Sequence, residues 1–155
     1  MTDEIEIVHA LPDHTDDLAP LFDAYRCWYG KSSDLAGAQG FIRQRLTSNE
    51  SEIFFARRQH QPVAFTQLYP TFSSVSMGRV WILNDLYVVE SVRREGVGTV
   101  LLETAAEFAR ALGAVRLQLE TKQDNVAALA AYEALGWTQD SDFLHYSLDV
   151  SETDD

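Results

Sequence analysis

Residues 93–98, R-R-E-G-V-G, decide the fold, because a strand-like pattern precedes them and a helical pattern follows them. Before them runs RVWILNDLYVV (residues 79–89), which is almost entirely apolar and β-prone; after them, helical spacing continues to about Leu112. Glycine allows close backbone approaches that a Cβ forbids, and the first N–H groups of a helix have no partner within it. With the positive end of the helix dipole behind them, these groups suit an anion such as pyrophosphate. We therefore predict a phosphate-binding loop between a strand and a helix.

Two well-known phosphate motifs do not fit this loop. A Walker loop requires G-x-x-x-x-G-K-[ST], which is absent here. A dinucleotide fingerprint requires a third glycine, but counting from Gly96 that position is Leu101. A G-x-G pair at a helix start also serves plain packing, so the loop alone leaves packing and phosphate binding open.

The remaining elements follow from periodicity, and the sequence shows no internal repeat or interdomain linker. Alternation predicts further strands at residues 5–9, 52–58, 62–72 and 114–121, and helical spacing predicts helices at residues 16–30, 32–48, 96–112 and 124–135. Residues 137–150, WTQDSDFLHYSLDV, are expected to close the fold as a hairpin or a pair of short strands. We predict one α/β (α+β) domain over residues 1–150, with an acidic, flexible tail at residues 151–155.

Composition limits the possible partners. The chain has 155 residues, and 12 basic against 24 acidic side chains give a net charge of −12. Such a field repels nucleic acid and attracts cations, although simple solubility is the better explanation of the acidic excess.

No apolar run is long enough to span a membrane, and the acidic N-terminus does not resemble a signal sequence. Cys27 is the only cysteine, which fits a reducing cytoplasm, and we expect it to be a buried small hydrophobe.

Two segments together resemble the GNAT superfamily of N-acetyltransferases. Residues 83–114 contain that superfamily's Q/R-x-x-G-x-G/A pattern, met by Arg93, Gly96 and Gly98. Residues 125–137 are similar to its N-x-x-A-x-x-x-Y-x-x-x-G-F segment, met by Asn125, Ala128, Tyr132, Gly136 and Trp137, with Trp in place of the final Phe. YGKSSD and LNDLYV further resemble the Hpa2-like branch, whose relatives include diamine and thialysine acetyltransferases.

The resemblance implies a GNAT fold, with a mixed, mostly antiparallel sheet of about seven strands flanked by about four helices. It also implies a V-shaped splay between the strands ending near Val88 and Glu120, with a bulge near residues 86–89. Acetyl-CoA is then the cosubstrate, and four scattered histidines give no ligand spacing for a metal. The implied cofactor-binding residues are Leu86, Tyr87, Val88, Arg93, Arg94, Glu95, Gly96, Val97, Gly98, Thr99, Asn125 and Tyr132.

The catalytic residues are implied less completely. Tyr132 occupies the family position of the general acid that protonates the leaving sulfur, although it also fits a helix face that packs a core. The glutamate that serves diamine acetyltransferases is replaced by Asn84, which cannot act as a base. Asp85 and Glu120 remain as carboxylates at strand ends, and an ion pair or turn cap suits each of them as well as catalysis does.

An acceptor site is expected beside these groups. Tyr25, Trp28 and Tyr29 cluster at the end of the first helix, where their faces could hold a cationic amine next to Asn84 and Asp85; plain core packing is equally open. We therefore expect acetylation of a small cationic amine. Acetylation of a protein lysine or N-terminus is the alternative, followed by a non-catalytic acyl-CoA sensor. The related branch also implies a homodimer.

Overall fold

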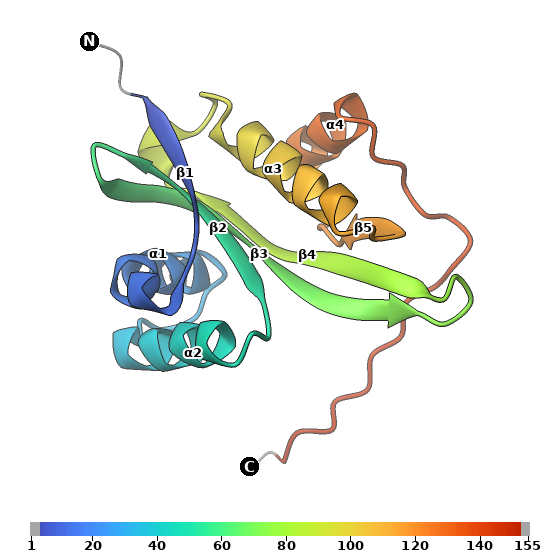
Figure 1. Cartoon of the computed structure of the whole chain (residues 1–155), viewed down its shortest axis with the longest axis horizontal. Helices are drawn as coiled ribbons and strands as arrows, with labels where there is room; N and C mark the ends of the chain where they lie inside the picture. Colours follow the sequence, from blue (N-terminus) through green and yellow to red (C-terminus); the bar gives the residue numbers. More distant parts are fainter. Residues whose placement is uncertain (1–3, 153–155) are drawn as a thin grey trace. The chain divides into compact units, whose positions relative to one another are not determined.

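The structure is a computed structural model in which residues 4–152 are described. The chain divides into two compact units, one ending at Glu120 and the other beginning at Thr121, and each is described by itself (Figure 1). Residues 153–155 of the predicted acidic tail lie outside the described residues.

The first unit contains the sheet and three α-helices. Its strands are β1 (Ile5–His9), β2 (Glu52–Arg58), β3 (Gln61–Ser73), β4 (Gly78–Val88) and β5 (Arg116–Leu119). Its helices are α1 (Thr15–Trp28), α2 (Leu35–Thr47) and α3 (Val97–Ala111), with short 3₁₀ turns η1 (Pro12–His14) and η2 (Glu90–Val92) before α1 and α3. The sequence patterns predict each of these elements except the two 3₁₀ turns. None of the described helices is both long enough and apolar enough to cross a membrane.

The strands form one sheet in the order β1-β2-β3-β4-β5. Strands β1 to β4 pair antiparallel with their neighbours, whereas β5 runs parallel to β4. Parallel neighbours need a crossover, and α3 provides it between β4 and β5. The predicted mixed, mostly antiparallel sheet is therefore confirmed.

The predicted number of strands is wrong. Within the described residues the sheet has five strands rather than about seven. The missing strands are those expected at residues 137–150, which form no strand in the described chain. Alternating apolar residues make a strand only where a neighbouring strand supplies hydrogen bonds, so alternation alone overestimates the number of strands.

The two faces of the sheet carry different aromatic layers. Phe65 packs edge-on against Phe22 and Tyr25 of α1. Phe54, by contrast, packs against Phe108 of α3. Because successive strand residues point to opposite faces, α1 and α3 cover opposite sides of the sheet, as Figure 1 shows. The functional strand β4 is thus held between two packed layers.

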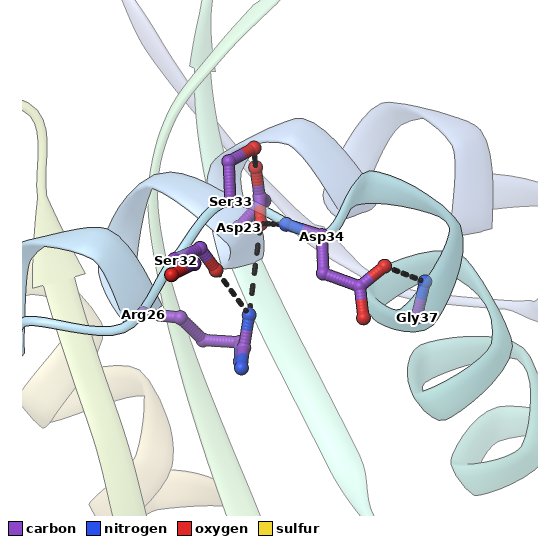
Figure 2. A network of polar contacts seen from close by, with 6 residues as sticks. All are labelled: Asp23, Arg26, Ser32, Ser33, Asp34 and Gly37. Carbon is purple, nitrogen blue, oxygen red and sulfur yellow. Dashed lines mark hydrogen bonds and ion pairs between the residues drawn. The ribbon is translucent and has the colours of Figure 1, made fainter.

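The connection between α1 and α2 is fixed by Asp23 (Figure 2). Its carboxylate accepts a hydrogen bond from the Ser33 hydroxyl at 2.6 Å and one from the Asp34 N–H at 2.8 Å. These bonds lower the pKa of Asp23, the Ser33 hydroxyl contributing most. Asp34 in turn caps α2 by accepting from the Gly37 N–H at 2.9 Å. Hydrogen bonds from α1 and to α2 therefore fix the loop that follows the aromatic end of α1.

Cys27 does not have the buried position expected of it. It is exposed on α1, whereas Leu18 and Tyr25 of the same helix are buried. Two residues beyond Tyr25 amount to about 200° around a helix, which turns Cys27 away from the sheet.

The second unit contains α4 (Val126–Ala134). Asn125 is its N-cap, but the Asn125 side chain makes no capping hydrogen bond. Tyr132 lies on α4 with its ring centroid 6.0 Å from that of Trp137, and the Trp137 N–H donates to the Tyr132 carbonyl at 3.0 Å. The two aromatic residues of the second motif therefore pack on one another.

Candidate active site

The pairing between β4 and β5 ends early, which exposes one edge of β4. The last register pair is Leu83 with Leu119, yet β4 continues to Val88. On the other side the Val89 N–H donates to the Val63 carbonyl at 2.9 Å, so β3 follows β4 throughout. Backbone groups alternate in direction along a strand, so the N–H and C=O of Val88 face away from β3, on the side where β5 has ended.

The irregularity in β4 lies earlier than predicted. The register jumps from Gln67 paired with Asp85 to Leu68 paired with Leu83, which leaves Asn84 as the extra residue. The bulge is thus at Asn84 and not at residues 86–89. Its consequence is local, because a bulge bends the strand and re-aims the side chains beside it.

The glycine loop has a left-handed backbone and leads into a helix start without a side-chain cap. Gly96 is the N-cap of α3 with φ +85°, and Arg94 also has a positive φ of 68°. No side chain caps this helix, and its first backbone bond runs from the Val100 N–H to the Gly96 carbonyl. A Cβ built on Gly96 meets no atom within 4 Å, so the space above the loop is open. The residues present therefore fit a pyrophosphate bound by backbone N–H groups.

Two charged side chains of the loop have partners within the protein. Glu95 accepts a hydrogen bond from Arg58 Nη2 at 2.6 Å. Arg93 Nε donates to the Val88 carbonyl at 2.8 Å, and its guanidinium lies 5.7 Å from the ring centroids of both Trp28 and Tyr87. Arg58 thus offsets the one negative charge in the loop, and Arg93 connects the loop to the aromatic end of α1.

Asp85 is a buried carboxylate surrounded by donors. Its side chain is 7% exposed. Oδ1 accepts from the Tyr25 hydroxyl at 2.9 Å and from Asn84 Nδ2 at 3.2 Å, and Oδ2 accepts from Gln67 Nε2 at 2.9 Å. Burial, with the Asp85 charge as the second cause, raises the pKa of Tyr25 far above that of a free tyrosine. Tyr25 is therefore a donor to Asp85 and stays protonated throughout the physiological range.

The aromatic cluster predicted at the end of α1 is present. The Tyr25 ring lies 5.2 Å from Tyr29 and 5.7 Å from Tyr87, and Trp28 lies 5.1 Å from Tyr29. Trp28 and Tyr29 are exposed, while Tyr25 is buried. The cluster thus joins a solvent-facing aromatic wall to the Asp85 carboxylate through one hydroxyl group.

The structure brings some of the predicted residues together. Tyr25, Asn84 and Asp85 share one hydrogen-bond network. Glu120 is exposed just beyond the end of β5, and Tyr132 belongs to the second unit, which is described by itself. Sequence reasoning missed Gln67 and Arg58, because a buried glutamine or a strand-end arginine carries no local motif.

Comparison with known proteins identifies the class that this fold and site define. The Acetyltransferase (GNAT) family model matches residues 18–137. The uncharacterized N-acetyltransferase YhfO of Bacillus subtilis (strain 168) is 47% identical over 133 residues, covering 86% of this chain and 89% of YhfO. Thialysine N-epsilon-acetyltransferase of Caenorhabditis elegans is 26% identical over 132 residues, covering 85% of this chain and 82% of that enzyme. The crystal structure of a probable acetyltransferase matches with a TM-score of 0.89 at 43% identity, covering 96% of this chain and 99% of that one.

The chain belongs to the GNAT acetyltransferase family. It is an acetyl-CoA-dependent N-acetyltransferase, as the two sequence motifs predict. No group of three or more potential metal-ligating side chains occurs among residues 4–152.

Replacing Gly96 should weaken cofactor binding. In Gly96→Val the β-branched side chain enters the open space above the loop, at a backbone φ of +85° that only glycine adopts without strain. We expect calorimetry to show CoA affinity reduced at least about tenfold, equivalent to the loss of one or two backbone hydrogen bonds to a charged group.

The matched control is Gly98→Ala, because the GNAT pattern accepts alanine there. A Cβ at Gly98 meets only Val88 Cγ2, at 3.7 Å, which is an ordinary contact. This variant should bind CoA nearly as the parent does, with both variants retaining the parent's circular dichroism spectrum. Undiminished CoA affinity in a folded Gly96→Val protein would overturn the placement of the pyrophosphate.

Proposed function

We propose that the enzyme transfers the acetyl group of acetyl-CoA directly to a primary amine of a small cationic acceptor, such as a polyamine or lysine-like amine. The observation that carries the proposal is the buried Asp85 carboxylate behind the aromatic wall of Trp28 and Tyr29. Aromatic faces attract a cation at short range, and a carboxylate behind them attracts it further. The net charge of −12 favours the approach of the same class of acceptor.

We further propose that residues 1–150 function as one domain, in the cytoplasm, as a homodimer without nucleic-acid or membrane partners. In support of one domain, the family match over residues 18–137 spans both structural units. The acidic composition argues against nucleic acid, whose binding requires neutralised phosphates.

The exposed edge of β4 supports a role for its backbone in catalysis. The pantetheine arm would bond the free side of Leu86, Tyr87 and Val88 as an added strand does. The Val88 N–H would then polarise the thioester carbonyl while the amine nitrogen attacks it, which stabilises the negative charge that develops on oxygen. The C–N bond would form first, and the C–S bond would break as the tetrahedral intermediate collapses to the amide and the CoA thiolate. The diphosphate would bond the backbone from Arg94 to Thr99.

Two proton movements complete the reaction. The ammonium must lose a proton before it attacks, because its pKa is ordinarily about 10.4. Tyr132 would donate a proton to the leaving sulfur, and Asn125 would contribute to cofactor binding. Asp85 and Glu120 are the candidate acceptors of the amine proton. Both Asp85 oxygens already accept hydrogen bonds, so Asp85 would act through a water chain or through the electrostatic attraction of its charge.

Two other functions compete with this proposal. Acetylation of a protein lysine or N-terminus would use the same wall and carboxylate. A non-catalytic acyl-CoA sensor would keep the loop at residues 93–98 but would not need Tyr132 or Asp85. The Asp85 network favours an enzyme that binds a positively charged group, because it holds a carboxylate next to the aromatic cluster, where its charge would attract a cation.

An amine-panel assay tests the acceptor. With acetyl-CoA and free-thiol detection, we expect polyamines and lysine analogues to exceed neutral amines in kcat/KM by about tenfold or more, as one cation–π contact with charge attraction provides. Amino sugars, basic peptides and a reaction without amine complete the panel. Turnover confined to basic peptides would establish the protein-acetylating alternative. Binding of acetyl-CoA without any turnover would establish the sensor.

Removing the Tyr132 hydroxyl tests the general acid. In Tyr132→Phe we expect kcat to fall about 10²-fold or more while acetyl-CoA affinity stays near the parent value, because only the proton donor is lost. Tyr146→Phe removes a hydroxyl from another tyrosine of the second unit and should leave kcat unchanged. Equal rates in the parent and Tyr132→Phe would exclude Tyr132 as the acid.

The variant Asp85→Asn tests whether the negative charge of Asp85 contributes to recognition of the cationic acceptor, without disturbing the packing. In Asp85→Asn the new amide group needs an acceptor, and within the described residues Gln67 Oε1 is buried without a hydrogen-bond partner. A flip of the Gln67 amide supplies that acceptor, so the variant should fold normally. We expect kcat/KM for the cationic acceptor to fall about 10²-fold while CoA affinity is retained.

Glu103→Gln is the control for net charge, because it removes one negative charge from an exposed position on α3. Its kcat/KM should stay within about twofold of the parent value, since exposed charges are screened by salt. If Asp85→Asn behaves in the same way, Asp85 has no part in acceptor recognition or proton transfer.

A further inference from the structure

Glu95 is the acidic residue of the glycine loop, and its position lets it compete with a phosphate. It directly precedes Gly96, the N-cap of α3, which carries no capping group of its own. A carboxylate near a helix N-terminus is attracted by the helix dipole and can accept hydrogen bonds from the first free N–H groups. A bound diphosphate would use the same groups. An unrestrained Glu95 side chain would therefore oppose cofactor binding.

In the structure the Glu95 carboxylate is held by a residue of the sheet. Its Oε1 accepts a hydrogen bond from Arg58 Nη2 at 2.6 Å. Arg58 is the last residue of β2 and precedes Glu95 by 37 positions in the sequence. The contact therefore forms only when β2 is packed beside the loop, and it draws the carboxylate towards β2.

The alternation of side chains along β2 directs Arg58 to the α3 side of the sheet. Phe54 and Arg58 are four residues apart on this strand, so their side chains lie on the same face. Phe54 packs against Phe108 of α3, which identifies that face. Arg57 lies on the opposite face and bonds Glu6 of β1 at 2.7 Å. Two adjacent arginines thus serve opposite faces, and Arg58 reaches the loop.

Stability alone does not explain the position of Arg58. Its Nε is buried and has no hydrogen-bond partner within residues 4–152, which is unfavourable for folding. The side chains of Arg58 and Glu95 are 23% and 45% exposed, and an ion pair exposed to this degree adds little stability. An effect of Arg58 on the loop therefore explains the contact better than an effect on the fold.

We propose that Arg58 is a positioning residue for the cofactor and that it acts through Glu95. Arg58 holds the carboxylate away from the start of α3 and offsets its charge, so the first N–H groups of the helix stay available to the diphosphate of CoA. The inference rests on the proposed placement of the diphosphate at residues 94–99, which Gly96→Val tests separately. It is independent of the identity of the amine acceptor.

A double-mutant cycle followed by calorimetry tests this role. Arg58→Met keeps an unbranched side chain and removes the charge together with the unpartnered Nε, so the variant should fold. Its affinity for CoA at low salt should fall about tenfold, because an unneutralised carboxylate then faces the diphosphate. Adding Glu95→Gln should restore the affinity to within about threefold of the parent value, since the competing charge is gone. Glu95→Gln alone should bind CoA at least as tightly as the parent does.

Two controls separate this role from a general effect on charge or folding. Arg57→Met removes an equal charge from the opposite face of β2 and should leave CoA affinity unchanged. Acetyl-pantetheine lacks the phosphates of CoA, so its kcat/KM should be the same in the parent and in Arg58→Met. The loss of CoA affinity in Arg58→Met should also shrink as salt is added. Unchanged CoA affinity in Arg58→Met, no recovery in the double variant, or an equal loss with acetyl-pantetheine would each overturn the proposal.

Discussion

The early end of the β4–β5 pairing is the constraint on which the site depends. Two parallel strands that stayed paired to their ends would use every backbone group between them, and no ligand could enter the sheet. Here the last pair is Leu83 with Leu119, so the last five residues of β4 keep β3 on one side only. The glycine loop begins just beyond that unpaired stretch, which places the backbone N–H groups of α3 next in the chain. One topological feature thus generates both a strand edge and a helix N-terminus for a single extended ligand.

The buried carboxylate of Asp85 depends on hydrogen-bond donors that surround it. A buried carboxylate is costly unless donors surround it, and this one has three side-chain donors. They come from α1, β3 and β4, so the network exists only when helix and sheet are packed. Burial, with the Asp85 charge as the second cause, raises the pKa of Tyr69 to about 12. Tyr25 and Tyr69 therefore both stay protonated in the environment of this carboxylate.

The sequence predicted most of the first unit because its signals are local. The α3 loop is specified by two glycines in a short pattern, and the aromatic end of α1 by helical spacing. The bulge at Asn84 and the Gln67–Asp85 contact were not predictable, since each depends on register between strands far apart in sequence. The strand count was wrong for a related reason. Alternation at residues 137–150 reports a preference for strand pairing, but it does not say which strand would supply the partner.

Arg93 joins the glycine loop to the edge of β4 and to the aromatic end of α1. Its Nε donates to the Val88 carbonyl, on the side of β4 that faces away from β3, while its guanidinium lies over Trp28 and Tyr87. A carbonyl oxygen has two lone pairs, so the Val88 oxygen can accept a second hydrogen bond while Arg93 stays in place. The guanidinium also offers a positive charge to the two aromatic faces. One side chain of the loop therefore fixes the position of the loop relative to both β4 and α1.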